Sequence, residues 1–517
     1  MVAPPTTESS PRPSVGPSLT PEERRRLRDG TPEEQWALLR KLSQDPNFSD
    51  PSPLQEALSS VSPTVRSGAL WLLKRMGASE LWESLLPYLK DPDPRVRASA
   101  AETLGDLRQT GAIPALTEAL ADPSPETRLH AAWSLWSLHA TTAAGALRPL
   151  LHDPEAPVRC AAVTALGRFG HPSDLDLLLE ALADPSDRVR RSALLALRGY
   201  DSRALGEKIR PFLSDPSSRV RIAAAVTLGE IGDRGSVPAL LEHYPGEDNF
   251  GHPAMLVALG KIGDPRAVPV VTGALRDKNY STVICALWVV GAMRIESARS
   301  EVLPLLATRS VRVRGATLEA LGRLGNPEDL SLLVPALSDT DPWTRRGATL
   351  GLGYLGRPEA ASPLLPLLRD PDPEVRLGTV WALGVIGARA AIPEMLRLLE
   401  EEILRWTRTG SVSPSGVDEG TVVAEGEGAV RLISDAKEIL LDTLLLSLAR
   451  LAELEGEGLR LRMRESLGRL PPELQELRVR LPQAEPRRVP LQRLSRRELV
   501  EVLPSREAGR GPGRDPA

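Results

Sequence analysis

The residues best suited to chemistry gather between positions 243 and 288 of this chain. Only 3% of the chain is aromatic, yet this stretch combines histidine, asparagine and aromatic residues: His243, Tyr244, Asp248, Asn249, Phe250, His252, Asn279 and Tyr280. Two histidines and an aspartate could ligate a metal ion, but such loop spacing is weak evidence for a metal site, so we expect no metal. The stretch is a candidate ligand-contacting patch, or it consists of repeat units that diverged without gaining a function.

Sequence motifs for catalysis are missing. The chain has no GxxxxGK[ST] phosphate loop, no GxSxG nucleophile elbow and no HExxH metal helix. A catalytic site assembled from distant parts of the chain would leave no such motif. We therefore expect a non-enzymatic protein without a cofactor.

A pattern with a period of 31 residues positions these side chains. A turn beginning with Asp is followed by Val-Arg and a helix rich in Ala, Leu and Gly, as in Asp91-Pro-Asp-Pro-Arg-Val96-Arg97. Its Val or Thr, here called the register residue, recurs without insertion or deletion at 65, 96, 127, 158, 189, 220, 282, 313, 344 and 375, with Gly at 251. Each unit contains two helices, and the register residue lies near the start of the second. This predicts an all-α, right-handed α-solenoid of about eleven repeats.

Glycines recur at two positions of the second helices. Glycine inside a helix costs about 1 kcal/mol relative to alanine, so its periodic return predicts close helix approach at Gly229, Gly260, Gly291, Gly322, Gly353 and Gly384. The second set follows three residues later and predicts C-terminal caps at Gly232, Gly263, Gly325, Gly356 and Gly387.

Aspartate and arginine form two further periodic sets. The aspartates precede the second helices, and the arginines follow the register residues. They could form a charged strip that recognises a partner. The favoured interpretation is structural: each Asp caps a helix, and each Arg bonds neighbouring turns.

A third candidate is an apolar strip on the second helices, away from the stripe that faces the core. Six residues after the register residue the helix has turned by about 240°, and this position holds Trp71, Trp133, Leu195, Val226, Val257, Trp288, Leu350 and Trp381. One turn earlier the same face holds Leu129, Ile222, Ile284 and Leu377. Either the strip is exposed and binds a partner, with Trp as the usual anchor, or neighbouring second helices cover it.

Composition limits the function classes. The formal net charge of −4 disfavours a protein built to bind nucleic-acid phosphates. The two cysteines, Cys160 and Cys285, are not paired in a CxxC motif, which fits a reducing cytoplasm. The start of the chain lacks the apolar segment of a secretory signal, and no apolar run could span a membrane. The predominance of Arg over Lys suggests a GC-rich, bacterial genome.

The repeats do not fill the chain. We expect a disordered tail over 1–20, a solenoid with an N-terminal cap over 21–407, and a flexible loop over 408–428. A Leu-rich helix should begin the C-terminal cap over 429–481, and a disordered basic tail should follow over 482–517.

The unit Asp-Pro-x-x-x-Val-Arg-x-x-Ala-Ala-x-x-Leu-Gly-x-Ile/Leu-Gly resembles the HEAT-like repeats of the phycobilisome-lyase type over roughly residues 31 to 400. The resemblance implies a superhelix with the second helices on its concave side. That family includes scaffolds, chromophore-lyase subunits, a metal-dependent hydroxylase and relatives of DNA glycosylases. None of the six histidines is followed by Glu, as the hydroxylase's iron ligands would require, and the solenoid is too acidic for a glycosylase groove.

Three functions follow as hypotheses. The leading one is a non-enzymatic, cytoplasmic scaffold or adaptor that holds another protein in its concave groove. The second is an accessory or catalytic subunit of a chromophore-lyase-like enzyme, with its cofactor near the irregular stretch. The third is nucleic-acid binding through the tail after Gly458, which carries 14 Arg against 8 acidic residues.

Overall fold

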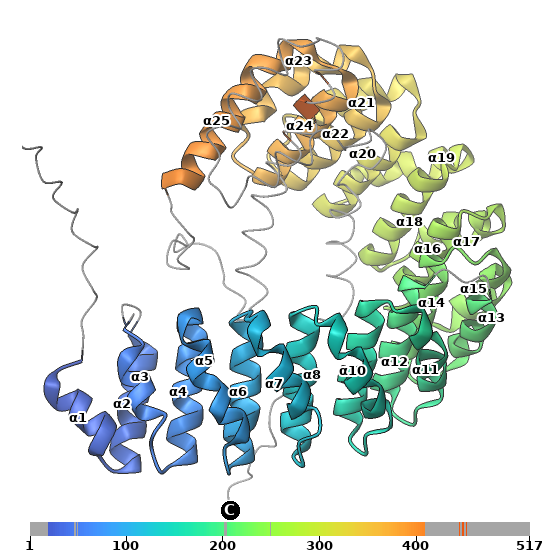
Figure 1. The fold of residues 1–517 in the computed structure, drawn as a ribbon. Helices are drawn as coiled ribbons and strands as arrows, with labels where there is room; N and C mark the ends of the chain where they lie inside the picture. The colour runs from blue at the N-terminus through green and yellow to red at the C-terminus, as the bar shows by residue number, and fades with distance from the viewer. Residues whose placement is uncertain are drawn as a thin grey trace, which may run out of the picture. The chain divides into compact units, whose positions relative to one another are not determined.

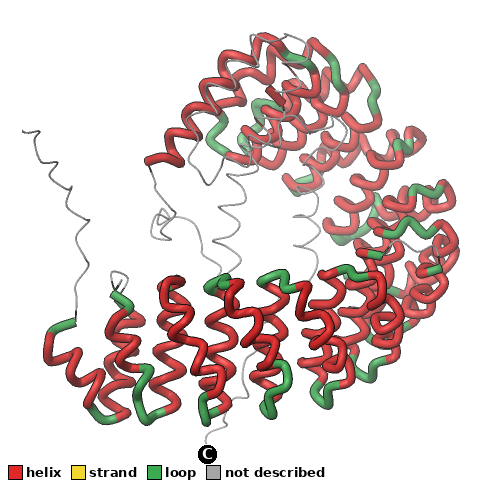
Figure 2. Tube along the Cα trace, in the orientation of Figure 1, coloured by secondary structure: helices red, strands yellow, loops and turns green. Residues whose placement is uncertain are grey.

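The computed structural model describes residues 19–45, 48, 50–200, 204–248 and 250–408, together with Leu444, Ser447, Leu448 and Leu451. In this part of the chain every regular element is a helix (Figure 2). Residues 1–18 of the expected N-terminal tail, 409–428 of the expected loop, the expected basic tail and most of the expected C-terminal cap lie outside the described residues.

The described residues form an α-solenoid, as predicted. Eleven second helices succeed one another along the chain (Figure 1): α4 (Pro63–Met76), α6 (Pro94–Asp106), α8 (Pro125–Ser137), α10 (Ala156–Phe169), α12 (Asp187–Ala196), α14 (Ser218–Glu230), α16 (Gly251–Ile262), α18 (Tyr280–Met293), α20 (Val311–Leu324), α22 (Pro342–Leu355) and α24 (Pro373–Ile386). Every register residue on them is buried. The stripe predicted from spacing therefore faces the core.

The first helices are short, and all except α3 adjoin at least one 3₁₀ turn: α3 (Ser52–Ala57), α5 (Trp82–Leu85), α7 (Ile113–Ala119), α9 (Ala144–Leu147), α11 (Leu175–Glu180), α13 (Leu205–Ile209), α15 (Val237–His243), α17 (Val268–Ala274), α19 (Arg299–Val302), α21 (Leu330–Ala336) and α23 (Ala361–Leu364). Proline explains several of the breaks. Pro149 and Pro304, for example, lie at the start of a 3₁₀ segment directly after α9 and α19. Because proline has no N–H to donate, the α-helical hydrogen-bond series ends there.

The N-terminal helices begin as their sequences predict. Thr20 caps α1 (Pro21–Asp29) and Thr31 caps α2 (Pro32–Gln44), each in a capping box with the Glu three residues later. Within the described ranges, the last continuous helix is α25, which spans Ile392–Arg408.

The chain divides into two compact units, Met1–Thr227 and Leu228–Ala517. In the first unit each second helix from α4 to α12 packs on the next, and in the second unit the same holds from α16 to α24. Leu444, Leu448 and Leu451 are fully buried in the core of the second unit, which also contains Leu383 and Met395. This is the contact that a C-terminal cap on the last repeat would make.

The periodic glycines serve both expected purposes. A Cβ atom on Gly322 of α20 would overlap the carbonyl group of Gly351 on α22, so only glycine permits this close approach. The glycines that end the second helices adopt positive φ, as at Gly325 with +80°, and form left-handed caps.

The turns carry a ladder of Arg–Asp pairs that tie each unit to the next. Arg97 shows the geometry: its Nε donates to Oδ2 of Asp122 at 2.7 Å, and its Nη2 donates to Oδ1 at 2.8 Å. Its Nη1 donates to the carbonyl oxygen of Asp91 at 2.9 Å. The same two-pronged contact recurs at Arg66–Asp91, Arg97–Asp122, Arg128–Asp153, Arg159–Asp184, Arg190–Asp215 and Arg345–Asp370. The structural interpretation of the arginines is confirmed.

The expectation that these aspartates cap the helices is wrong. Asp91 lies two residues before the N-cap of α6, which is Asp93, and accepts the N–H of Asp93 at 2.9 Å. The carboxylate is committed to the turn and to Arg66 of the preceding unit. Helix capping is thus left to another residue, two positions later.

The ladder stops at the irregular centre. At the arginine position the chain has His252 and Val283, and at the aspartate position it has Gly246 and Thr308. Beyond the centre, Nη2 of Arg314 lies 3.9 Å from Oδ2 of Asp339, longer than a hydrogen bond. The two-pronged contact returns at Arg345.

Candidate partner-binding face of the second helices

The predicted apolar strip is exposed in some places and covered in others. Trp71 is 48% exposed, and Leu129, Trp133, Ile284 and Trp288 are half-buried. At five positions the alternative of a covered strip holds, because the side chains are buried: Ile222, Val257, Leu350, Leu377 and Trp381.

Trp381 shows why the strip is covered near the C-terminal end of the array. Its ring packs on Tyr354, with 4.8 Å between ring centroids, and lies against the backbone of Gly353 on α22. It belongs to the core cluster of the second unit. The glycine lets the indole enter the space between helices, so this Trp stabilises the array.

Where the strip is exposed, a hollow opens between helices α2, α4 and α6 of the first unit. Its volume is about 370 Å³ and its lining is mainly apolar. Trp36 and Trp71, 40% and 48% exposed, both line it. Trp36 lies over Gly68, where a Cβ atom would come within 2.6 Å of the indole. We call this space the first hollow.

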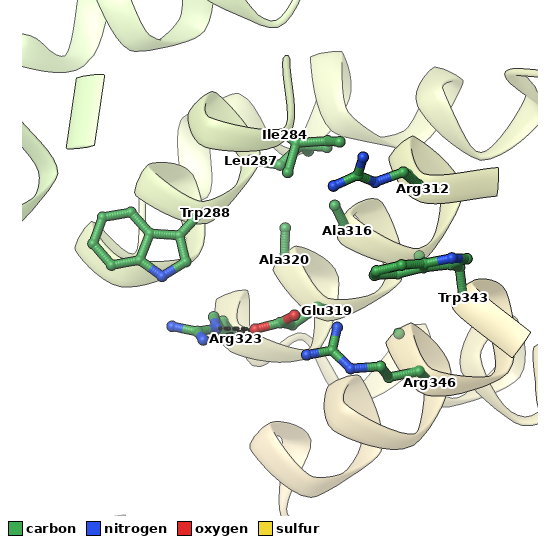
Figure 3. A pocket seen from close by; sticks show the side chains of 12 residues that line it. Ile284, Leu287, Trp288, Arg312, Ala316, Glu319, Ala320, Arg323, Trp343 and Arg346 are labelled. Carbon is green, nitrogen blue, oxygen red and sulfur yellow. Dashed lines mark hydrogen bonds and ion pairs between the residues drawn. The ribbon is translucent and has the colours of Figure 1, made fainter. Parts of the chain in front are cut away.

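A second hollow lies between α18, α20 and α22 of the second unit (Figure 3). Trp288 and Trp343 stand on opposite sides of it, and Ala316 and Ala320 lie between them. The free space is only about 30 Å³. We call it the second hollow.

Arginine side chains occupy the second hollow and are bonded within it. Arg323 donates from Nη2 to Oε1 of Glu319 and to the hydroxyl oxygen of Tyr354, each at 2.7 Å. Burial, together with the charge of Glu319, raises the pKa of Tyr354 to about 12. The guanidinium groups of Arg312 and Arg346 lie on either side of Trp343, 5.2 and 5.8 Å from its ring (Figure 3).

The two hollows occupy equivalent positions of the repeat. Ten residues of the first hollow have counterparts in the second exactly eight periods later. Arg40 corresponds to Trp288, and Arg95 corresponds to Trp343. Trp36 and Trp71 correspond to Ile284 and Glu319. Tryptophan and arginine therefore line both hollows, but at different positions of the repeat.

The irregular centre brings together some of the residues predicted there. The rings of Tyr244 and His252 stack with 4.6 Å between centroids. Burial raises the pKa of Tyr244 to about 12, helped by the charge of Asp277. Phe250 and Tyr280 are 52% and 54% exposed.

Other residues of the centre have local structural contacts. Asn279 caps α18 by accepting the N–H of Ser281 at 2.9 Å. His243 bonds through Nδ1 to the carbonyl oxygen of Ala239 at 2.8 Å. Asn249 lies outside the described residues. Among the described side chains, no group of three His, Cys, Asp or Glu residues is placed to hold a metal ion.

Comparison with known families shows what kind of repeat this is. Six overlapping stretches match the family model of HEAT repeats: residues 51–124, 113–198, 184–251, 206–287, 284–350 and 330–413. The chain belongs to the HEAT-repeat family. The predicted HEAT-like repeats are thereby confirmed.

Several solved structures resemble this HEAT-repeat chain. YibA from E. coli is 20% identical, covering 50% of this chain and 96% of YibA, with a TM-score of 0.40. The complex of CpcE and CpcF of phycocyanin lyase from Nostoc sp. is 22% identical, covering 56% of this chain and 100% of that chain, with a TM-score of 0.32. Yeast importin-beta (Kap95p) is 12% identical, covering 88% of this chain and 70% of that chain, with a TM-score of 0.47. These likenesses concern the fold alone.

No curated protein matches the sequence at a significant level. Among the helices of the described residues, none has both the length and the apolar character needed to cross a bilayer.

Several residues of the hollows were missed by sequence reasoning. Trp36 lies in the repeat before the first clear register residue, so the periodic alignment did not include it. Trp343 directly precedes a register residue, at the position that Phe250 holds in the irregular centre. An aromatic residue at that position of a HEAT repeat was the signal that could have found it.

Proposed function

We propose that this protein is a non-enzymatic scaffold that binds another protein on the exposed face of its second helices. The observation that carries the proposal is the pair of Trp-lined hollows at equivalent positions of the two units. Tryptophan and arginine are the residues most enriched where protein partners bind strongly. An array of repeats presents such positions on one continuous face in each unit.

The roomier first hollow is the better candidate for the main contact. A space of about 370 Å³ accepts a large side chain, and Trp36 and Trp71 offer exposed rings on which to pack it. The Arg–Asp ladder lies in the turns, and its arginines and aspartates bond to one another. They therefore stabilise this face and are not available to bind the partner.

Affinity capture tests this function. The tagged full chain is incubated with extract of the source organism, and bound proteins are identified by mass spectrometry. The double variant Trp36→Ala/Trp71→Ala should lose the captured protein. Trp82→Ala is the matched control, because Trp82 lies on first helix α5 and packs over Gly111.

Two results would contradict the proposal. Capture that depends on Trp82 and not on Trp36 and Trp71 would place the binding surface elsewhere. A coloured or absorbing species that co-purifies with the chain would favour a subunit of a chromophore lyase. Trp288→Ala, measured in the same way, shows whether the second hollow also contributes.

A further inference from the structure

The first hollow combines apolar walls with positive charge. Arg40 on α2 and Arg95 on α6 both line it, and both are exposed. No aspartate or glutamate is among the residues that line it. A third guanidinium, that of Arg75, lies 5.5 Å from the ring of Trp71. The hollow is therefore electropositive around an apolar centre.

Two of these three arginines, Arg40 and Arg95, have no bonded partner in the described part of the chain, whereas Arg75 donates from Nη1 to the carbonyl oxygen of Ser43. The lack of a partner at Arg40 and Arg95 contrasts with the second hollow, where Arg323 is bonded to Glu319 and Tyr354. It also contrasts with the ladder, where each arginine binds an aspartate.

A buried hydroxyl group adds a polar contact inside the hollow. Ser67 on α4 lines the space, and its Oγ is buried without a hydrogen-bond partner among the described residues. A buried polar atom without a partner costs free energy, and a ligand could supply the partner of this oxygen only if the wall of the hollow shifts to expose it.

We propose that the first hollow binds an acidic linear peptide segment of a partner protein, which inserts one large apolar side chain between Trp36 and Trp71. Carboxylates on either side of that anchor pair with Arg40 and Arg95, because a guanidinium group binds a carboxylate through two parallel hydrogen bonds. This inference rests on the proposed function, since it names the kind of partner that the second-helix face binds.

The charge of the chain favours a peptide over nucleic acid. Gripping a phosphate backbone takes many cationic contacts on one face, whereas only three arginines surround this hollow and the whole chain has a formal charge of −4. Two or three carboxylates beside one apolar anchor match this arrangement.

The test is fluorescence anisotropy with the full chain and a fluorescein-labelled peptide, GSDEWDELDSG. We expect saturable binding that weakens as salt is raised. Two matched peptides separate the contributions: GSNQWNQLNSG removes the charges, and GSDEADEADSG removes the apolar anchors. Each should bind about tenfold more weakly or worse.

Variants of the chain locate the site. Arg40→Glu and Arg95→Glu should each weaken binding of the acidic peptide by about tenfold. Arg276→Glu makes the same charge change on a side chain that is 74% exposed in the second unit, and should alter binding by less than about twofold. Because all three arginines are exposed, thermal melting should confirm that these variants fold.

Four outcomes would overturn the proposal: no binding of the acidic peptide, equal binding of the neutral peptide, indifference to Arg40→Glu and Arg95→Glu, or tighter binding of a labelled oligothymidylate with the same arginine dependence. If the peptide fails while capture from extract still depends on Trp36 and Trp71, the proposed function survives and only the acidic partner is wrong.

Discussion

The two hollows lie at equivalent positions of the repeat, but they differ in whether their arginines are bonded to other side chains. In the first, the arginines Arg40 and Arg95 stand at an open space of about 370 Å³. In the second, three arginines line the space, Arg323 is bonded to Glu319, and about 30 Å³ remains. The repeat thus determines where a hollow forms, while a few substitutions determine whether it is open to a partner or closed by its own side chains.

The Arg–Asp ladder and the close glycine contacts hold in place the helices that border the two hollows. The Arg66–Asp91 pair links α4 to the turn before α6, and both helices border the first hollow. The glycine contact between α20 and α22 brings together two helices that border the second. Substitutions that break these contacts should lower the free energy of unfolding most, and substitutions of residues that line the hollows should lower it least.

The largest loss of stability is expected when the Arg66–Asp91 pair beside the first hollow is broken. Asp91→Ala leaves Arg66 without its carboxylate in a pair whose side chains are 11% and 6% exposed, so the free energy of unfolding should fall by about 3 kcal/mol. Asp93→Ala, in the same turn, removes only a helix cap and should cost about 1 kcal/mol. Urea unfolding of both variants measures the difference, and equal losses would refute the structural role of the ladder.

One methyl group added at Gly322 should disrupt the contact between α20 and α22 beside the second hollow. Gly322→Ala forces α20 away from Gly351 of α22 and should lower the free energy of unfolding by about 2 kcal/mol. Gly145→Ala is the control, because its Cβ atom meets nothing within 4 Å. A neutral Gly322→Ala would show that the helices do not need this close approach.

Acid should weaken the Arg–Asp ladder, because its aspartates lose their negative charge when they are protonated. Burial alone would raise the pKa of Asp122, but the hydrogen bonds from Arg97 and from the N–H of Ser124 outweigh it and lower the pKa. A carboxyl group with a lowered pKa stabilises the fold above its unfolded pKa of about 3.9, and this stabilisation is lost as the pH falls through the lower, folded value.

Melting temperatures measured between pH 7 and pH 2 check this sign. The wild-type chain should lose stability below about pH 4, and Asp122→Asn should lose less over the same range because it has no carboxylate to protonate. A larger acid loss in Asp122→Asn than in the wild type would contradict the assignment.

Much of this architecture could be predicted from sequence because it is periodic. The register residues, the arginine ladder and the glycine contacts follow from residue type and a 31-residue spacing, and the structure confirms them. The exposure of the Trp residues could not be predicted. It depends on neighbouring units: Gly353 admits Trp381 into the core, whereas Gly68 receives Trp36 and leaves Trp71 exposed.

The smallest effect on stability is expected from exchanging Gly68 and Ala316, which occupy equivalent positions in the two hollows. Gly68→Ala gives the first hollow the residue that the second has at Ala316, and its Cβ atom would displace the indole of Trp36. Because the obstacle is the end of a side chain, stability should change by less than about 1 kcal/mol. Tryptophan fluorescence should shift in Gly68→Ala and stay unchanged in the reciprocal Ala316→Gly; no shift in Gly68→Ala would mean that Trp36 does not rest on this glycine.

Capture of the partner by two variants tests directly whether the first hollow is the binding site. Asp93→Ala removes the cap that binds the backbone N–H of Arg95 and keeps every side chain that lines the first hollow, whereas Trp36→Ala/Trp71→Ala removes the walls of the hollow. Both chains, shown by melting to be folded, are used to capture the partner from the same extract. We predict that Asp93→Ala retains the partner and that the Trp variant loses it. Retention by the Trp variant, or equal loss in both, would contradict this prediction.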